Sequence, residues 1–273
     1  MRLWYQSLTW ADAWPGYNAA LRQLLDRAGD PGTEIEIHGI RKRGGIGDQY
    51  RYLEFIEAQE VLENVERAAR EGFDAFLIGN IGDPGLREAR EITGMPVIGL
   101  CETSTHLASM MGGNFALVTG NEKHATRIVE NVGRYGLREK LHSVHAMSVV
   151  RLVDLDAGFS NPGAGTTLVE EFVVAARLAA DAGAEVVIPA VGVLMVLLAG
   201  RGIHSINTTV PVLNGVVALV KMAESIVRMR RLMGGHWTSK RATYAPPPAS
   251  QMEELRKAYG NVYPEIKSEK GPS

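Results

Sequence analysis

The chain has 273 residues, of which 45% are hydrophobic and 22% are charged, with a formal net charge of −2. This composition is typical of a soluble globular protein with one large or two medium domains, and the near-neutral charge gives no reason to expect nucleic acid or a membrane as a partner. The single cysteine excludes an intramolecular disulfide. Together with an amino terminus that predicts a strand instead of a signal peptide, it favours a cytoplasmic location.

Strand patterns and helix patterns alternate along the first hundred residues. Strands are expected at 3–7, 33–40, 72–80 and 96–102, and helices at 16–28 and 52–70. The glycine-rich segment 41–49 between them is typical of a loop that closes over a ligand. Asp83 and Pro84 have the residue types of an N-cap and a first helical position, so a further helix is expected to open there.

The second half continues the alternation. A strand is expected at 115–119, a helix that ends near Gly136 follows it, and the capping box Thr167-x-x-Glu170 predicts a helix that ends at Ala182. A long helix is expected at 214–233. Beyond it, the proline-rich residues 244–248 predict an extended linker before one last short helix.

One segment of the sequence occurs twice. Residues 72–80 (GFDAFLIGN) precede 96–99 (PVIG), and residues 183–191 (GAEVVIPAV) precede 211–214 (PVLN), at separations of 111 and 115 residues. Each copy predicts a buried strand, a strand-end loop, a helix and a second strand, which together form a parallel α/β unit. Ligands of such sheets bind outside the carboxyl ends of the strands, so residues 80–83 and 191–194 are expected to form two walls of one site.

These patterns predict an α/β fold of two pseudo-symmetric, Rossmann-like lobes with parallel sheets and an active-site cleft between them. Lobe one is expected to comprise residues 1–109 plus 210–232, and lobe two residues 110–209. Residues 233–273 form a C-terminal extension that is expected to wrap the body of the protein or a neighbouring subunit. We expect a homo-oligomer.

Three stretches resemble the Asp/Glu/hydantoin racemase superfamily, and most of all its hydantoin and allantoin racemase branch. They are 72–86 (GFDAFLIGNIGDPGL), 95–107 (MPVIGLCETSTHL) and 210–221 (VPVLNGVVALVK). The resemblance runs from Met1 to about Leu232 and implies the two-lobed fold, a small-molecule substrate and no cofactor. In that family each strand-end loop presents a cysteine to one face of an acidic C–H. The matching positions here hold Asn80 and Val191, which excludes proton transfer by two thiols.

Three side chains are the candidates for acid/base chemistry. Glu102 is the strongest carboxylate candidate, because it ends a predicted strand and burial near a pocket would raise its pKa. Asp83 is a general acid or base, or alternatively an ionised N-cap and a poor proton donor. His106 is expected near the cleft, with a structural role as its alternative. Cys101 fits a small buried hydrophobe better than a nucleophile.

Substrate contacts are expected at the ends of the predicted strands and in the glycine-rich loop, although each of these residues also suits a turn or a surface loop. The candidates are Gln6, Ser7, Asp48, Tyr50, Asn80, Ile81, Gly82, Thr119, Gly120, Asn121, Val191 and Gly192. The histidines and the cysteine form no metal-binding pattern, and no dinucleotide or phosphate loop is present.

Two functions of different classes follow. The first is a cysteine-independent enzyme of isomerase, lyase or hydrolase type that acts on a small carboxylate or cyclic amide and stabilises an oxyanion in the cleft. The second is a non-catalytic small-molecule binding protein that retains the cleft.

Overall fold

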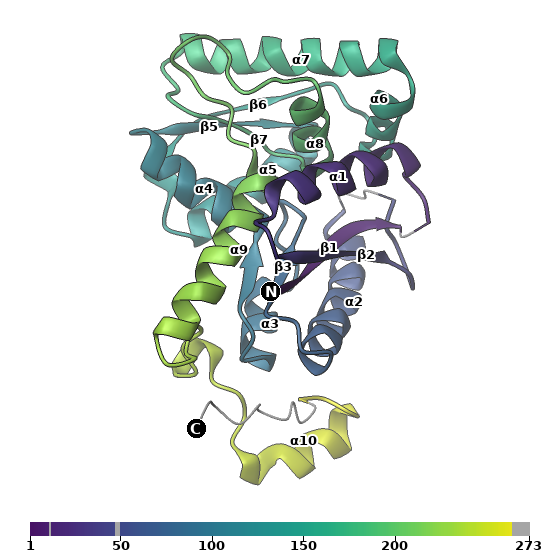
Figure 1. Ribbon diagram of the computed structural model, residues 1–273, viewed down its shortest axis with the longest axis vertical. Coiled ribbons are helices and arrows are strands. Elements are labelled where there is room, and N and C mark those ends of the chain that lie inside the picture. Colours follow the sequence, from purple (N-terminus) through teal and green to yellow (C-terminus); the bar gives the residue numbers. More distant parts are fainter. Residues whose placement is uncertain (11, 47–49, 264–273) are drawn as a thin grey trace.

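The computed structural model describes residues 1–10, 12–46 and 50–263, and it forms two parallel sheets in separate lobes (Figure 1). The first sheet contains β1 (Arg2–Trp10), β2 (Glu34–Ile40), β3 (Ala75–Ile78) and β4 (Val97–Gly99) in the order β2-β1-β3-β4. The second sheet contains β5 (Phe115–Thr119), β6 (Leu141–Ala146) and β7 (Val187–Pro189) in the order β6-β5-β7. The two-lobed α/β architecture is therefore as expected.

The two sheets share one strand order, which confirms the structural meaning of the sequence repeat. Val212 forms a parallel bridge with Val187 of β7, in the position that β4 takes beside β3. The amide of Val187 donates to the carbonyl of Pro211 at 3.0 Å, and the amide of Leu213 donates to the carbonyl of Val187 at 2.9 Å. Residues 211–213 thus complete the second sheet. The expectation that the chain returns to lobe one at residue 210 is wrong, because this segment pairs with its own repeat unit.

Ten α-helices and four short 3-10 helices occur in the described residues. The α-helices are α1 (Pro15–Ala28), α2 (Arg51–Arg70), α3 (Leu86–Ile92), α4 (Leu100–Met111), α5 (Glu122–Arg134), α6 (Ala157–Ser160), α7 (Pro162–Asp181), α8 (Gly192–Gly200), α9 (Gly215–Leu232) and α10 (Met252–Tyr259). The 3-10 helices are η1 (Arg138–Lys140), η2 (Leu152–Asp156), η3 (Ala242–Tyr244) and η4 (Ala249–Gln251). None of the described helices combines the length and the apolar character that a membrane crossing requires.

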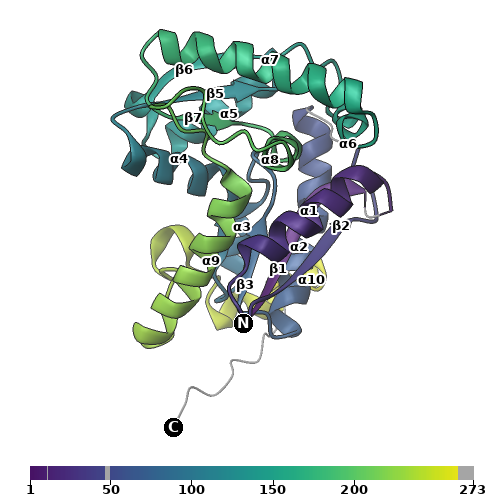
Figure 2. The same cartoon turned by 45° about the horizontal axis from the view of Figure 1, so that its top comes forward.

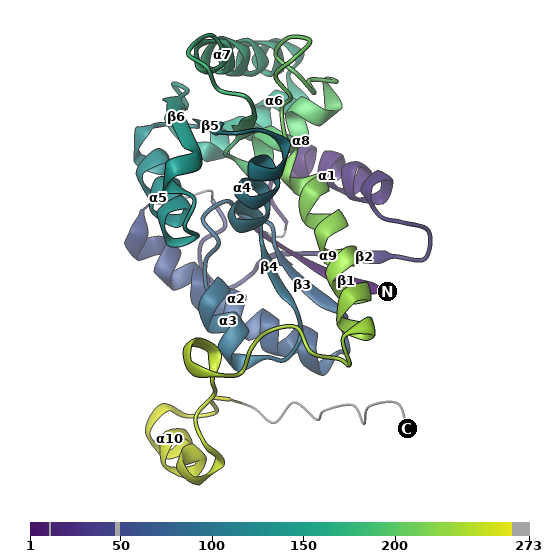
Figure 3. The same ribbon diagram turned by 90° about the vertical axis from the view of Figure 1, so that its left-hand side faces the viewer.

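The lobes exchange one helix each. Helix α4 follows the first sheet but packs against α5, β5 and β7, whereas α9 follows the second sheet and packs against α1, β3 and β4. The two exchanged helices also pack against each other (Figure 3). Helix α7 covers the side of the second sheet that faces away from the first lobe (Figure 2). These exchanges hold the carboxyl ends of the two sheets against one another.

Two predicted boundaries are wrong for local physical reasons. The strand expected at 96–102 ends at Gly99, and α4 begins at Leu100, so Cys101 and Glu102 are helical. Helix α7 begins at Pro162 instead of near Thr167, because Asn161 accepts hydrogen bonds from the amides of Gly163 and Ala164 at 2.9 and 3.2 Å. An Asn-Pro pair of this kind caps a helix and fixes its first turn.

The C-terminal extension folds back onto α3 of its own chain. The Lys240 ammonium donates to the carbonyls of Arg90, Glu91 and Thr93 at 2.5, 3.0 and 2.7 Å. These carbonyls belong to the last turn of α3, where a cation complements the helix dipole. The Tyr263 hydroxyl donates to Glu91 at 2.6 Å. The extension is therefore attached to the helix that follows the strand-end loop of β3.

Candidate functional site

The strand-end loops of the two lobes meet at two glycines. A methyl group added to Gly192, which follows β7, would lie 3.2 Å from the carbonyl oxygen of Gly79, which follows β3. A methyl group on Gly120, at the end of β5, would lie 3.6 Å from Cγ2 of Val191. Asn80 and Val191 therefore lie at the junction between the lobes. Because Gly120 and Gly192 have no side chain, the two loops can approach each other closely.

The loop at 80–83 is a compact turn held by the second lobe. The side-chain oxygen of Asn80 accepts the amide of Gly82 at 2.7 Å, while its amide nitrogen has no hydrogen-bond partner among the described residues. Ile81 and Gly82 are buried. The carbonyl of Gly82 accepts the side-chain amide of Asn131, on α5, at 2.8 Å. Asn80 thus shapes the turn with the oxygen of its side-chain amide, and the nitrogen of that amide forms no hydrogen bond with the described residues.

The end of β1 contributes a buried group of hydroxyls behind this turn. The hydroxyls of Ser7 and Thr9 lie 2.9 Å apart. Burial raises the pKa of Tyr17 to about 12, although hydrogen bonds with Ser7 and Tyr5 oppose the shift. A methyl group on Gly79 would lie 2.5 Å from the Tyr5 hydroxyl oxygen. Ser7 therefore belongs to a polar layer directly beneath the junction.

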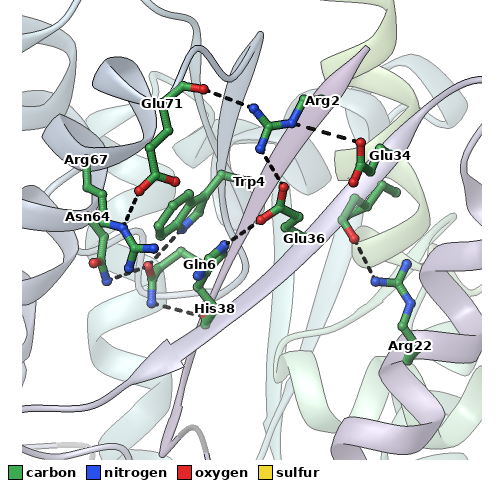
Figure 4. Close-up of polar contacts among 11 residues, drawn as sticks. Arg2, Trp4, Gln6, Arg22, Glu34, Glu36, His38, Asn64, Arg67 and Glu71 are labelled. Atoms are coloured by element: carbon green, nitrogen blue, oxygen red, sulfur yellow. Dashed lines mark hydrogen bonds and ion pairs between the residues drawn. The ribbon is translucent and has the colours of Figure 1, made fainter.

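Gln6 was expected beside Ser7, but the strand directs it to the opposite face of the sheet, since successive side chains alternate. Its amide nitrogen donates to the carbonyls of Ser7 and His38 at 2.9 and 3.2 Å. Its oxygen accepts from Trp4 and Asn64 at 3.1 and 2.9 Å. Figure 4 shows this network, in which the rings of Trp4 and His38 stack with centroids 3.4 Å apart. Every hydrogen-bonding position of Gln6 is occupied within the protein, so its predicted role in binding substrate would require one of these bonds to be exchanged.

The second lobe presents an open hollow of about 710 Å³ beside the ends of β5 and β6. Tyr50 and Asn121 both line it, together with Val149 and Leu152. The oxygen of Asn121 accepts the amide of His124 at 3.0 Å and so caps α5, and its nitrogen donates to the carbonyl of Val149 at 2.8 Å. The Thr119 hydroxyl donates to the carbonyl of Asn121 at 3.1 Å. These side chains fix the loop at 147–152, whose residues line the hollow. Asp48 lies outside the described residues.

Asp83 has a different role from the predicted N-cap of its own helix. Its φ is +47°, and α3 begins only at Leu86. Its carboxylate accepts hydrogen bonds from the amides of Cys101 and Glu102 at 3.0 and 2.9 Å, so it caps the amino end of α4, a helix that lies later in the chain. The N-cap position of α4 is Gly99, and a methyl group there would lie 2.6 Å from the Asp83 carboxyl carbon.

The environment of Asp83 also shifts the pKa of its carboxyl. Burial raises the pKa of this carboxyl to about 7, although hydrogen bonds from the Tyr135 hydroxyl and the two helix amides lower it. The Tyr135 hydroxyl donates to Asp83 at 2.6 Å. This shift favours the alternative in which Asp83 carries a proton over that of an ionised N-cap, because the loss of solvent outweighs the hydrogen bonds.

The other acid/base candidates lie on α4. The Glu102 carboxylate forms a two-pronged ion pair with Arg90, with one contact of 2.9 Å, and the two side chains are only 24% and 15% exposed. His106 is exposed and one ring nitrogen lies 2.8 Å from the carbonyl of Glu102. Cys101 is fully buried, and burial raises the pKa of its thiol well above the ordinary value. Glu102 therefore has a structural partner that the sequence did not indicate.

Because Glu102 forms an ion pair with Arg90, we expect that removing its charge lowers the stability of the protein and leaves its activity almost unchanged. Changing Glu102 to glutamine should lower the free energy of unfolding by about 1–3 kcal/mol, because it leaves a largely buried guanidinium without its counterion. Turnover should stay within a few-fold of the parent. Glu71, which pairs with Arg67 on the surface of α2, is the matched control, and its change to glutamine should cost at most about 0.5 kcal/mol. Urea unfolding gives the stability of each variant, and a turnover assay gives its activity. A hundredfold loss of turnover in Glu102→Gln at unchanged stability would show that Glu102 is an acid/base residue.

One functional candidate was missed by the sequence analysis. His124 is the third residue of α5 and is 7% exposed. It shares a helix face with Ile128, Asn131 and Tyr135, and the latter two contact the 80–83 loop. His124 lies two turns, about 10 Å, nearer to the end of β5 than Asn131. Its Nδ1 is buried without a partner, and burial lowers the pKa of the imidazole to about 4.

The imidazole of His124 is therefore neutral at pH 7, which is the form that accepts a proton. No hydrogen bond to either ring nitrogen occurs among the described residues. The signal in the sequence was the spacing of residues 124, 128, 131 and 135, which marks one buried face of α5. Among the described residues, no group of three histidine, cysteine or acidic side chains is arranged to hold a metal ion.

Two parallel sheets of matching strand order, joined at the carboxyl ends of their strands, define a two-lobed α/β protein whose site lies at the lobe boundary. The sequence profile of the Asp/Glu/hydantoin racemase family matches residues 17–223. This chain belongs to that family.

Individual relatives agree with this placement. The hydantoin racemase of Pseudomonas sp. (strain NS671) is 32% identical over 212 residues, which cover 76% of this chain and 77% of that protein. The hydantoin racemase of Rhizobium meliloti is 30% identical over 200 residues, covering 71% and 75%. Among solved structures, the allantoin racemase from Klebsiella pneumoniae is similar with a TM-score of 0.75 and 26% identity, over 91% of this chain and 94% of that one. The Pseudomonas fluorescens allantoin racemase gives a TM-score of 0.73 at 25% identity, covering 90% and 97%.

Proposed function

We propose that this protein is an enzyme that transfers a proton to or from one face of a small cyclic amide or carboxylate without using a thiol. The observation that supports this is the pair of residues at the junction of the lobes. Asn80 and Val191 stand where the resemblance places two cysteines, and the one cysteine of the chain, Cys101, is fully buried. Neither Asn80 nor Val191 can accept a proton from carbon.

A cyclic amide of the hydantoin class is the first substrate to consider, because the similar proteins are named hydantoin and allantoin racemases. The polar groups near the junction can form hydrogen bonds with the carbonyl and N–H groups of a neutral cyclic amide. They include the free amide nitrogen of Asn80 and the amino end of α8, which begins without a side-chain cap. That helix end also favours the negative charge that develops on an enolate oxygen.

The proton would be accepted by His124 from one face of the substrate. The neutral imidazole has a buried ring nitrogen without a hydrogen-bond partner and lies on the helix face that contacts the 80–83 loop. Asp83 is the second choice, because its pKa of about 7 would let it carry a proton, but its oxygens already bind α4 and Tyr135. Glu102 and His106 rank below these two. The opposite wall contains Val149, Leu152 and Val191, none of which is a base. Glu122 also lines the hollow, but it is exposed at the start of α5.

A one-sided site exchanges or delivers a proton on a single face, whereas racemisation needs an acid and a base on opposite faces. Single-face proton exchange and decarboxylation followed by protonation both fit this arrangement. The apolar wall and the occupied carboxylates also favour a second candidate function, a small-molecule binding protein that performs no chemistry.

The test is incubation of the protein with 5-substituted hydantoins, allantoin, aspartate and glutamate in D₂O. We expect deuterium to enter the acidic C–H position of a cyclic amide while its enantiomeric excess is retained, as followed by NMR and chiral chromatography. Racemisation at ordinary enzymatic rates that survives in a Cys101→Ala variant would overturn the proposal. Saturable binding with no exchange would support the binding protein instead.

A further inference from the structure

A second hollow, of about 420 Å³, lies between the lobes on the other side of the 80–83 loop. Helix α2 of the first lobe forms one wall, α5 of the second lobe forms another, and Gly82 and Asp83 lie between them. It shares no lining residue with the hollow at the ends of β5 and β6. It is distinct from the hollow at the ends of β5 and β6, and Gly82 and Asp83 of the 80–83 loop belong to its lining.

Arginines are concentrated in this hollow. Arg51 pairs with Glu130 and Arg127 pairs with Glu54, whereas Arg87 and Arg134 form no ion pair with the described residues. Burial, together with repulsion from Arg51 and Arg134, lowers the pKa of Arg127 to about 10. Burial is the larger cause of this shift, and Glu54, Glu88 and Glu130 also line the hollow. Arg87 and Arg134, which form no ion pair with the described residues, are the charges that an anion from solution would contact.

The rest of the lining combines apolar side chains with polar and acidic ones, among them Gln59, Glu88 and Tyr135. Phe55 is 67% exposed on α2, and Leu62 lies further along the same helix, opposite Pro84. An exposed phenyl ring next to arginines provides a flat apolar surface beside positive charge. A bare inorganic ion would use the arginines alone, whereas a ligand with a ring would use both parts of the hollow.

We propose that this second hollow binds a small organic anion, a carboxylate or a phosphate monoester that carries a planar apolar group. The charged end contacts Arg134 and Arg87, and the ring lies against Phe55. Because Arg134 belongs to α5 and Phe55 to α2, the bound anion links the two lobes. It also restricts the turn that contains Asn80, through Gly82 and Asp83.

Isothermal titration of the full chain with phenyl phosphate and with benzoate, at low salt, tests this proposal. We expect at least one probe to bind saturably and to bind more weakly as NaCl is added. The double variant Arg87→Ala/Arg134→Ala should weaken binding at least tenfold, since each lost charged hydrogen bond costs about 1.5–3 kcal/mol. Arg177→Ala, which removes an exposed arginine on α7, is the matched control and should bind like the parent. Binding of phenyl phosphate alone would identify a phosphate site, and binding of benzoate alone a carboxylate site.

A second comparison tests the apolar part. Phe55→Ala should weaken phenyl phosphate several-fold more than it weakens inorganic phosphate. Arg87, Arg134 and Phe55 are all exposed, so these variants are expected to fold, and their melting temperatures verify this. The proposal fails if neither probe binds saturably or if the double-arginine variant binds as tightly as the parent. These readouts use no turnover, so they stand or fall independently of the proposed enzymatic function.

Discussion

Changing His124 to glutamine should reduce turnover by about 10²–10⁴-fold, which is the loss expected when a positioned acid/base is removed. Glutamine keeps the polar character and much of the volume of histidine but does not titrate. His124 is buried and its Nδ1 has no partner, so the change breaks no hydrogen bond to either ring nitrogen. Turnover on the cyclic amide that exchanges deuterium is the measurement. His236, an exposed histidine, supplies the control, and His236→Gln should behave like the parent.

The pH profile of the parent provides an independent check. Burial lowers the pKa of His124 to about 4, and only the neutral imidazole accepts a proton. Activity should therefore persist down to about pH 4 and fall as the pH decreases through that value. An exposed catalytic histidine would lose activity near pH 6.5 instead. If His124→Gln turns over like the parent, Asp83 is the next candidate for proton transfer. If His124→Gln and Asp83→Asn both turn over like the parent, Glu102 and His106 remain.

The architecture was predictable from the sequence because it depends on a repeated pattern. The segments that begin at Gly72 and Gly183 each encode a strand, a loop and a second strand, and both form the same part of a sheet. Such a pattern is set by local burial and strand length, which the sequence records directly. The position of residues 211–213 was misjudged, because pairing between strands depends on partners that are distant in the chain.

The site was less predictable because its side chains bind groups contributed by distant segments. Asp83 precedes a proline and has the local signature of an N-cap, yet its positive φ directs the carboxylate to α4. Glu102 forms an ion pair with Arg90 of α3, and no spacing in the sequence indicated this contact. Gln6 followed the alternation of β1 to the face opposite Ser7. His124 was overlooked because the chemistry of a histidine depends on its burial, and burial is a property of the packed helix.

Between pH 4 and pH 7, the two buried titratable groups His124 and Asp83 should affect stability in opposite directions. His124 has a pKa of about 4 in the folded protein against an ordinary value of 6.5. Its contribution is present above pH 6.5 and is lost as the pH falls toward 4, with a total of about 3 kcal/mol at 1.36 kcal/mol per pKa unit. Asp83 has a pKa of about 7 against an ordinary value of 3.8. Its contribution is present below pH 3.8 and is lost as the pH rises through 7, with a total of about 4 kcal/mol.

Single variants separate these two effects, because each removes one group and leaves the rest of the chain to titrate as before. Relative to the parent, His124→Gln should gain stability as the pH falls from 6.5 to 4, since the penalty of a buried imidazole is gone. Asp83→Asn should lose stability relative to the parent over the same interval, on top of a constant loss from the weakened cap of α4. Urea unfolding at pH 4.5, 5.5, 6.5 and 7.5 gives the difference curves, with His236→Gln as the flat reference. Difference curves for the two variants that slope in the same direction would contradict the assigned shifts. A flat curve for Asp83→Asn would mean that the hydrogen bonds from Tyr135 and α4 keep this carboxylate ionised in spite of its burial, and Asp83 would then be a structural cap with no proton to give.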